Sequence, residues 1–289
     1  MKDDAFSKCH PLTNFLFFLG AIGFCAVIQH PIYLLLDAVG AGGYYLLLKG
    51  KKGWSLIAGL IPVFFLLSGI NPLLNTYGAT ALFHVFGRPY TLEALLYGMV
   101  IAGMLVVMLL WFGCYSAVLT SDKFVCLFGG LIPSLSLLLV MILRMIPSLT
   151  RKAVQIADAR KSVGKGTGAS ENKKGKVLGG MRILSALTDW ALEGSIITAD
   201  SMRARGYGCA KRSSFRIYRF ALRDILLICL MVVFLLGTLL AGGTEASFTP
   251  ELRIASPSWG LASYAAFLLL PLILHGIEVI QQRTSLARL

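Results

Sequence analysis

The sequence predicts an all-α membrane protein, and three observations support this prediction. Of the 289 residues, 56% are apolar and only 14% are charged, a balance that excludes an ordinary soluble domain. Several apolar runs approach the roughly 20 residues that a helix needs to cross a bilayer. A basic block interrupts these runs. Residues 144–219 hold sixteen Lys or Arg and five Asp or Glu, a local net charge of +11 in a chain that carries +13.

Four apolar runs in the first 120 residues predict four membrane spans. The runs cover residues 12–29, 31–48, 54–70 and 92–120. Proline favours the break between the first two, at His30-Pro31. The basic loop at residues 49–53 is expected in the cytoplasm, because cytoplasmic loops are rich in Lys and Arg. This places the N-terminus inside as well, and it places the loop at residues 71–90 outside.

The next apolar segment, residues 124–145, breaks the alternation of sides. Lys123 before it and Arg144 and Arg151 after it are all expected in the cytoplasm, and a straight span cannot have both ends on one side. Gly129-Gly130 followed by Pro133 is a natural site for a bend. We therefore expect a re-entrant, strongly bent or oblique element. The alternative, a straight span with the basic block outside, violates the positive-inside bias by about eleven charges.

Two helices are predicted in the basic block that follows. An amphipathic helix is expected over residues 148–163, after Pro147. The polar, glycine-rich residues 164–175 are typical of a flexible linker. A second helix is expected over residues 181–205, roughly 37 Å long at 1.5 Å per residue. Its small side chains would allow another helix to pack closely.

Residues 220–241 and 261–280 predict two final spans. The resulting architecture has about six transmembrane helices, one bent or re-entrant segment and long cytoplasmic helices, with both termini in the cytoplasm. It divides into N-terminal transmembrane helices (1–120), a bent segment with a cytoplasmic helical domain (121–219) and C-terminal transmembrane helices (220–289).

The residue patterns do not indicate catalysis. No Ser-His-Asp set, histidine cluster or carboxylate pair stands out, and the six cysteines lack metal-ligand spacing. We therefore expect no enzymatic activity, no cofactor and no metal site. Nucleic acid is not expected as a partner, because basic residues beside spans are ordinary on cytoplasmic faces. Asp37, inside the second span, is either a proton or cation site or a carboxylate satisfied within the helix bundle.

Two short motifs lie near the predicted ends of the cytoplasmic helices. They are Ala159-Arg160-Lys161 and Ala204-Arg205-Gly206. A cation at a helix C-terminus is favoured by the helix dipole, and Gly206 suits a left-handed cap. The arginines are either helix caps or guanidinium groups that meet carboxylates on a partner. Asp200 is placed to pair with Arg203 three residues later.

Further segments complete the pattern, and with the two motifs they give the chain a resemblance to a known family. These segments are residues 71–75, 78–83, 91–98 and 143–149, and the stretch Ala199-Asp200-Ser201-Met202-Arg203-Ala204-Arg205-Gly206-Tyr207. Over nearly its full length the chain resembles the transmembrane T component of energy-coupling-factor transporters, a class of ABC importers. The stretch around Arg205 is the most specific element. Lys161 departs from the glycine or serine that is usual after the first Ala-Arg pair.

The resemblance implies a non-catalytic scaffold in the cytoplasmic membrane of a bacterium or archaeon. Two ABC-type ATPases would bind its cytoplasmic helices, each through a groove that receives one arginine motif. A separate membrane subunit would bind the transported vitamin or metal ion. The implied coupling site comprises Ala159, Arg160, Lys161, Ala204, Arg205 and Gly206, with Asp200, Arg203 and Arg144 in support. The alternative is a self-sufficient secondary transporter or channel, which should show polar sites near the midplane and often internal repeats.

Overall fold

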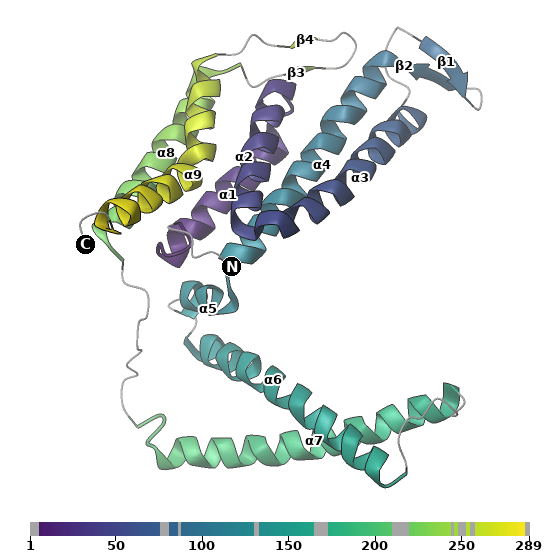
Figure 1. The fold of residues 1–289 in the computed structure, drawn as a ribbon, viewed down its shortest axis with the longest axis vertical. Helices are drawn as coiled ribbons and strands as arrows, with labels where there is room; N and C mark the ends of the chain where they lie inside the picture. Colours follow the sequence, from purple (N-terminus) through teal and green to yellow (C-terminus); the bar gives the residue numbers. More distant parts are fainter. Residues whose placement is uncertain are drawn as a thin grey trace. The chain divides into compact units, whose positions relative to one another are not determined.

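The computed structural model describes residues 6–75, 81–85, 88–129, 133–164, 173–209, 220–243, 246–247, 253–254 and 258–286. Most of these residues are helical, and the chain divides into two units (Figure 1). Unit 1 comprises Met1–Phe124 and Tyr218–Leu289, and unit 2 comprises Val125–Ile217. The division drawn from the sequence has its boundaries after residues 120 and 219.

Unit 1 is built from long apolar helices. They are α1 (Pro11–Val27), α2 (Pro31–Lys49), α3 (Gly53–Leu74), α4 (Leu92–Val118), α8 (Leu222–Ala241) and α9 (Trp259–Leu286), with the short 3₁₀ turn η1 (Gly50–Lys52) between α2 and α3. Pro11 and Pro31 begin α1 and α2, because a missing N–H costs nothing in the first turn. His10 and His30 cap these helices, each accepting a hydrogen bond from a backbone N–H two residues later.

Four described stretches are long and apolar enough to cross a membrane. They are Pro31–Leu74, Leu92–Val118, Leu222–Ala241 and Trp259–Gln281. The first has 44 residues and contains both α2 and α3, while α1 is apolar but has only 17 residues. The chain is therefore a helical membrane protein. The count of six spans made from the sequence requires that α1, α2 and α3 each cross separately.

Two short antiparallel hairpins were not predicted. Strand β1 (Ala81–Val85) pairs with β2 (Arg88–Thr91), and β3 (Ala246–Ser247) pairs with β4 (Arg253–Ile254). Both regions were expected to be loops, and α3 continues to Leu74 where a loop was expected from residue 71. Strands of two to five residues are too short to give a clear alternating pattern.

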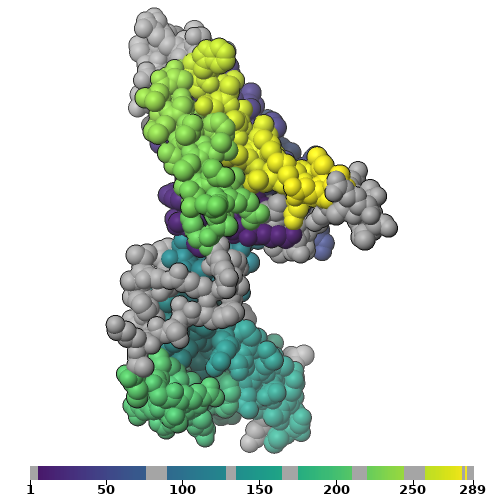
Figure 2. Space-filling view, turned by 90° about the vertical axis from the view of Figure 1, so that its left-hand side faces the viewer, coloured from purple at the N-terminus to yellow at the C-terminus, as the bar shows by residue number. Residues whose placement is uncertain are grey.

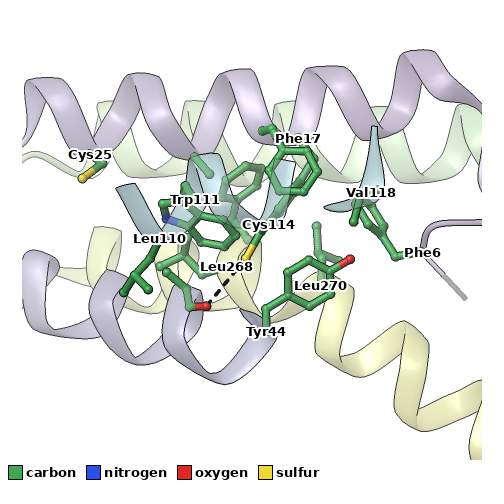
Figure 3. Close-up of a cluster of buried hydrophobic side chains, with 14 of the residues drawn as sticks. Phe6, Phe17, Cys25, Tyr44, Leu110, Trp111, Cys114, Val118, Leu268 and Leu270 are labelled. Atoms are coloured by element: carbon green, nitrogen blue, oxygen red, sulfur yellow. Dashed lines mark hydrogen bonds between the residues drawn. The ribbon is translucent and has the colours of Figure 1, made fainter. Parts of the chain in front are cut away.

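The core of unit 1 is aromatic and joins α1, α4 and α9 (Figure 3). The ring of Phe17 lies 5.6 Å from that of Trp111 and 5.0 Å from that of Phe267, between ring centroids. Aromatic pairs at such spacings add to the hydrophobic effect. The Cys114 thiol donates to the Ala41 carbonyl, with sulfur and oxygen 3.8 Å apart, and so joins α4 to α2. Figure 2 shows α8 and α9 side by side on one face of unit 1.

Two glycines of α4 allow it to lie close to α2. A Cβ atom at Gly103 would lie 2.7 Å from Leu34 Cδ2, and one at Gly113 would lie 2.9 Å from Tyr45 Cε2. Both distances are shorter than ordinary contacts between carbon atoms, which lie near 3.5–4.0 Å. Alanine at either position would therefore push the two helices apart or displace these side chains.

The bent segment of the sequence analysis corresponds to α5 (Ser121–Gly129) and the first part of α6 (Pro133–Ser162). The described part of α5 ends at Gly129 and that of α6 begins at Pro133, on either side of the place where a bend was predicted. Residues 130–132 lie outside the described residues. The prediction that a new helix begins after Pro147 is wrong, because α6 continues through this proline. An interior proline removes one backbone hydrogen bond, and here it does not end the helix.

Helix α7 (Lys173–Ala204) begins eight residues earlier than residue 181, where the sequence analysis placed its start. Its 32 residues correspond to about 48 Å at the usual rise per residue. The predicted linker, residues 164–175, included the first three residues of this helix, and three glycines lie in its first eight residues. One of them, Gly179, is buried and contacts α6, so tertiary packing outweighs the weak helix propensity of glycine.

Candidate functional site

Two contacts determine how α6 and α7 cross within unit 2. Lys152 Nζ lies 5.7 Å from the centroid of the Trp190 ring, a cation–π contact. Eight residues further along α6, the Arg160 guanidinium donates through Nη1 to the Gly179 carbonyl. The later residue of α6 meets the earlier residue of α7, so the helices run antiparallel where they cross. Figure 1 shows this crossing, with the C-terminal part of α7 extending beyond it.

The C-terminus of α7 forms a Schellman motif. The Gly206 N–H donates to the Arg203 carbonyl at 2.9 Å, and the Tyr207 N–H donates to the Met202 carbonyl at 3.0 Å. Gly206 has φ +77°, the left-handed conformation that glycine adopts without a steric cost. The left-handed cap predicted at Gly206 is therefore confirmed. The motif satisfies carbonyls that a helix end otherwise leaves unpaired.

Arg205 is the residue directly before this capping glycine, and its side chain is exposed. Among the described residues, its guanidinium has no hydrogen-bond or ion-pair partner. The neighbouring Ala204 is also exposed, and its small side chain leaves room for a second surface to approach. The helix end thus presents a positive charge with its donors available, where the helix dipole favours a cation.

The first motif occupies a different position in its helix. Helix α6 ends at Ser162, and the left-handed glycine is Gly164, with φ +72°. The Gly164 N–H donates to the Lys161 carbonyl at 3.0 Å. Arg160 therefore lies about one turn inside the helix end, where Arg205 lies at the end itself. Arg160 is half-buried and bonded to Gly179, so its side chain ties the two helices together.

The supporting residues are exposed. Arg203 Nη1 lies 3.8 Å from Asp200 Oδ1, which confirms the predicted pair. Lys161 Nζ lies 3.1 Å from Asp158 Oδ1. Exposed pairs of this kind contribute about 0–1 kcal/mol to stability, so they orient side chains more than they hold the fold. Arg144 is exposed on α6, and Ala159 is exposed beside Arg160.

Helix α7 also exposes large apolar side chains. The exposed fractions of the following side chains lie between 60% and 64%: Met181, Leu184, Leu192, Ile196 and Ile197. The same helix carries Lys176, Arg182, Asp189 and Glu193, which do not suit the interior of a bilayer. Apolar side chains exposed together on a polar helix mark a surface for another molecule.

Asp37 belongs to the core of unit 1. It is 1% exposed, and the indole Nε1–H of Trp111 donates to its Oδ1 at 2.7 Å. The side chains of Cys25 and Tyr264 lie beside the same carboxylate. A buried acid with such neighbours joins α2 to α4 and α9. The Trp111 contact supports a carboxylate satisfied within the helix bundle, whereas Oδ2, buried with no hydrogen-bond partner among the described residues, supports a proton or cation site.

The described residues offer little to a bound ion or polar substrate. Among them, no group of three or more His, Cys, Asp or Glu side chains could hold a metal ion. Between α3 and α4 lies a groove of about 340 Å³. Its lining is apolar: Ile57, Leu60, Ile61, Phe64, Phe65, Val106 and Leu110. A groove of this composition suits a hydrocarbon chain rather than a charged substrate.

Sequence reasoning missed two buried charged residues of unit 1. Asp224 was expected to need no special role, but it is 2% exposed and accepts backbone hydrogen bonds from His10 and Ala221. Lys123, expected in the cytoplasm beside the bent segment, is 5% exposed. Burial lowers the pKa of the His10 imidazole, while the nearby Asp224 carboxylate acts in the opposite direction. For Asp224 the sequence held one signal of this role: a carboxylate three residues after a helix N-cap can accept the backbone N–H of the cap residue.

Comparison with protein-family models gives no match, and comparison with curated proteins gives none either.

Proposed function

We propose that this chain is the T component of an energy-coupling-factor transporter. It is a membrane scaffold that couples two cytoplasmic ABC-type ATPases to a separate substrate-binding membrane subunit. The observation that carries this proposal is the C-terminus of α7. There the exposed Arg205 guanidinium, without a partner among the described residues, stands directly before the Gly206 cap. A guanidinium offers five donors in a planar fork that matches carboxylates, so this helix end suits an acidic groove on an ATPase.

The exposed apolar face of α7 supports the second half of the proposal. A scaffold of this kind needs one surface for the ATPases and another for the membrane subunit. The arginine-bearing helix ends serve the first role, and the apolar residues on one side of α7 serve the second: Met181, Leu184, Leu192 and Ile196. Apolar side chains of this size contribute about 1.5–3 kcal/mol each when they become fully buried. Because this contribution is non-directional, such a surface can bind a partner and still allow it to slide.

The proposed mechanism is the one that the family resemblance implies, and the antiparallel pairing of α6 and α7 supports one step of it. ATP binding closes the ATPase dimer and moves the two helix ends. The Lys152–Trp190 and Arg160–Gly179 contacts make the helices move as a pair. This movement reorients the substrate-binding subunit, which releases a vitamin or metal ion inside the cell. The chain itself hydrolyses no ATP and binds no cofactor. It lies in the cytoplasmic membrane with six spans and both termini inside.

The test is charge reversal at both helix ends. The double variant Arg160→Glu, Arg205→Glu should insert into the membrane normally but should not co-purify with the ATPases. Losing one partner of a desolvated charge pair costs about 2–5 kcal/mol, and reversal costs more. Arg203→Glu is the matched control, because Arg203 is 82% exposed, already faces Asp200 and points to another side of the helix. Normal recovery of ATPase with the double variant would overturn the proposal.

The alternative, a secondary transporter or channel, predicts transport by the chain alone. It requires a polar site within the spans, and Asp37 is the only early-span acid that could supply one. Trp111 donates to its Oδ1, which leaves only Oδ2 for a substrate or ion. Liposomes that contain the purified chain without ATPases should therefore show no substrate uptake.

A further inference from the structure

Residues 6–10, which we call the N-terminal strap, pack into unit 1 before α1 begins. The Phe6 ring is fully buried, and its centroid lies 5.1 Å from that of Phe17 and 6.3 Å from that of Phe18. The Cys9 N–H donates to the Phe6 carbonyl at 3.1 Å and closes a turn. Figure 3 shows Phe6 at one end of the aromatic core, near Val118 at the end of α4. The strap is thus anchored by the core.

On one side the strap binds Lys123, in the first turn of α5. The Lys123 ammonium donates to the Ser7 carbonyl and to Ser7 Oγ at 3.1 Å. With the Asn14 amide oriented so that its oxygen faces Lys123, that oxygen accepts at 3.2 Å, and its nitrogen donates to the Phe6 carbonyl at 2.9 Å. All three donors of the ammonium are then used. Lys123 is the second-last residue of unit 1 before unit 2 begins.

On the other side the strap binds Asp224, just after the chain has returned from unit 2. The His10 N–H donates to Asp224 Oδ1 at 3.0 Å, and the Ala221 N–H donates to Oδ2 at 3.0 Å. One carboxylate therefore joins the strap to the first turn of α8. The His10 ring also lies edge to face against Phe220, with centroids 4.8 Å apart. Hydrogen bonds to a buried charge are about twice as strong as those between neutral groups.

We propose that the N-terminal strap is a positioning element that holds together the two chain junctions at which unit 2 is inserted into unit 1. Lys123 marks the outgoing junction and Asp224 the returning one, and the strap is bonded to both. A displacement at one junction is therefore transmitted to the other through residues 6–10. One consequence rests on the proposed function. Because the strap fixes the two junctions, a movement of α6 and α7 also moves the membrane helices. Without the strap, the junctions would bend and the membrane helices would not move.

Hydrogen exchange of the full-length chain in detergent, read by mass spectrometry, tests the strap without any partner protein. Lys123→Met keeps an unbranched apolar side chain, one atom shorter, but removes the ammonium and its contacts with Ser7 and Asn14. Exchange should then accelerate about tenfold or more, the size expected when a hydrogen bond to a charged group is lost. The acceleration should appear at residues 6–14 and also at residues 221–225, across the strap. Lys51→Met, which removes an exposed lysine of η1, should change neither region.

The outcome that overturns the proposal is faster exchange confined to residues 6–14 and 120–124, with residues 221–225 unchanged. If Lys123→Met does not fold, Asp224→Asn provides the same test from the other side of the strap. Its amide has one oxygen, so it cannot replace the carboxylate that accepts from both His10 and Ala221. That variant should accelerate exchange at residues 120–124, and an unchanged rate there would overturn the proposal equally.

A transport measurement separates this proposal from the proposed function. In a reconstituted complex, Lys123→Met should retain ATPase assembly and ATP hydrolysis, but the amount of substrate moved per ATP should fall at least severalfold. A merely destabilised chain would lose assembly, hydrolysis and transport together, and that result would overturn the positioning role. If the wild-type chain binds no ATPase, the proposed function fails, while the exchange experiment still decides the role of the strap.

Discussion

Unit 1 and unit 2 place their polar groups in opposite ways. In unit 1, Asp37, Lys123 and Asp224 are at most 5% exposed, and each is hydrogen-bonded to another helix or to the N-terminal strap. In unit 2, Asp200, Arg203 and Arg205 lie exposed near one helix end. Burying a charge is costly unless it is paired, so these three charges of unit 1 serve the fold. The three exposed charges of unit 2 are available to another molecule.

The same contrast changes the meaning of exposed apolar residues. Leu240 in α8 is 85% exposed and Ile196 in α7 is 64% exposed. A leucine on a membrane span faces lipid, which is as apolar as the side chain itself, so Leu240 needs no protein partner. Helix α7 carries charges along its length, and Ile196 would face water unless a partner covers it. Exposure therefore indicates a binding surface in unit 2 but not in the spans of unit 1.

The largest effect that would sharpen this comparison is expected at Asp37. Asp37→Ala leaves the buried Trp111 N–H without its acceptor and opens a small cavity. Together these should lower the free energy of unfolding by about 2–4 kcal/mol. Asp189→Ala, at an exposed site in α7, should change it by less than about 0.5 kcal/mol. Thermal unfolding in detergent measures both.

The conservative change at the same position separates the two interpretations of Asp37. Asp37→Asn keeps an oxygen that can accept from Trp111, so stability and ATP-driven transport should both be largely retained. Complete loss of transport by a stable Asp37→Asn protein would instead assign a proton or cation to this residue, and it would break the contrast between the units.

An effect of similar size, on binding rather than on stability, is expected from the two arginines taken singly. Arg205→Ala removes an exposed guanidinium, and it should weaken ATPase binding by about 2–5 kcal/mol if that group enters an acidic groove. Arg160→Ala should weaken binding less, because Arg160 is half-buried and bonded to Gly179. It should also accelerate hydrogen exchange in the first turns of α7, which Arg205→Ala should not do. Equal losses of affinity would show that the two helix ends act alike.

The smallest effect is expected at the glycine cap. Gly206 has φ +77° with open space around its Cβ position, so alanine there meets no clash and is strained only in its backbone. The cost is about 1 kcal/mol, or about fivefold in ATPase affinity if the cap positions Arg205. Gly180→Ala, inside α7 with open space as well, should instead stabilise the helix by up to about 1 kcal/mol. Titration of the ATPase with each variant tests the pair, and a loss at Gly180 would contradict the role of the cap.

The sequence by itself determined the features that depend on local pattern. Apolar runs predicted the helices of unit 1 to within a few residues, because a membrane span needs a continuous apolar stretch whatever surrounds it. The Gly206 cap and the Asp200–Arg203 pair follow from residues a few positions apart. Such contacts form within one or two turns of the chain and need no tertiary partner.

Tertiary structure alone decided which polar groups are buried and what they bind. Arg160 and Arg205 look equivalent in the sequence, but Arg160 meets Gly179 on the facing helix and Arg205 does not. Lys123 and Asp224 resemble ordinary charges at span ends until the N-terminal strap covers them. The start of α7 was misplaced because glycine has a weak helix propensity, which the contact with α6 overrides. The partner of each group is distant in sequence, so no local pattern could identify it.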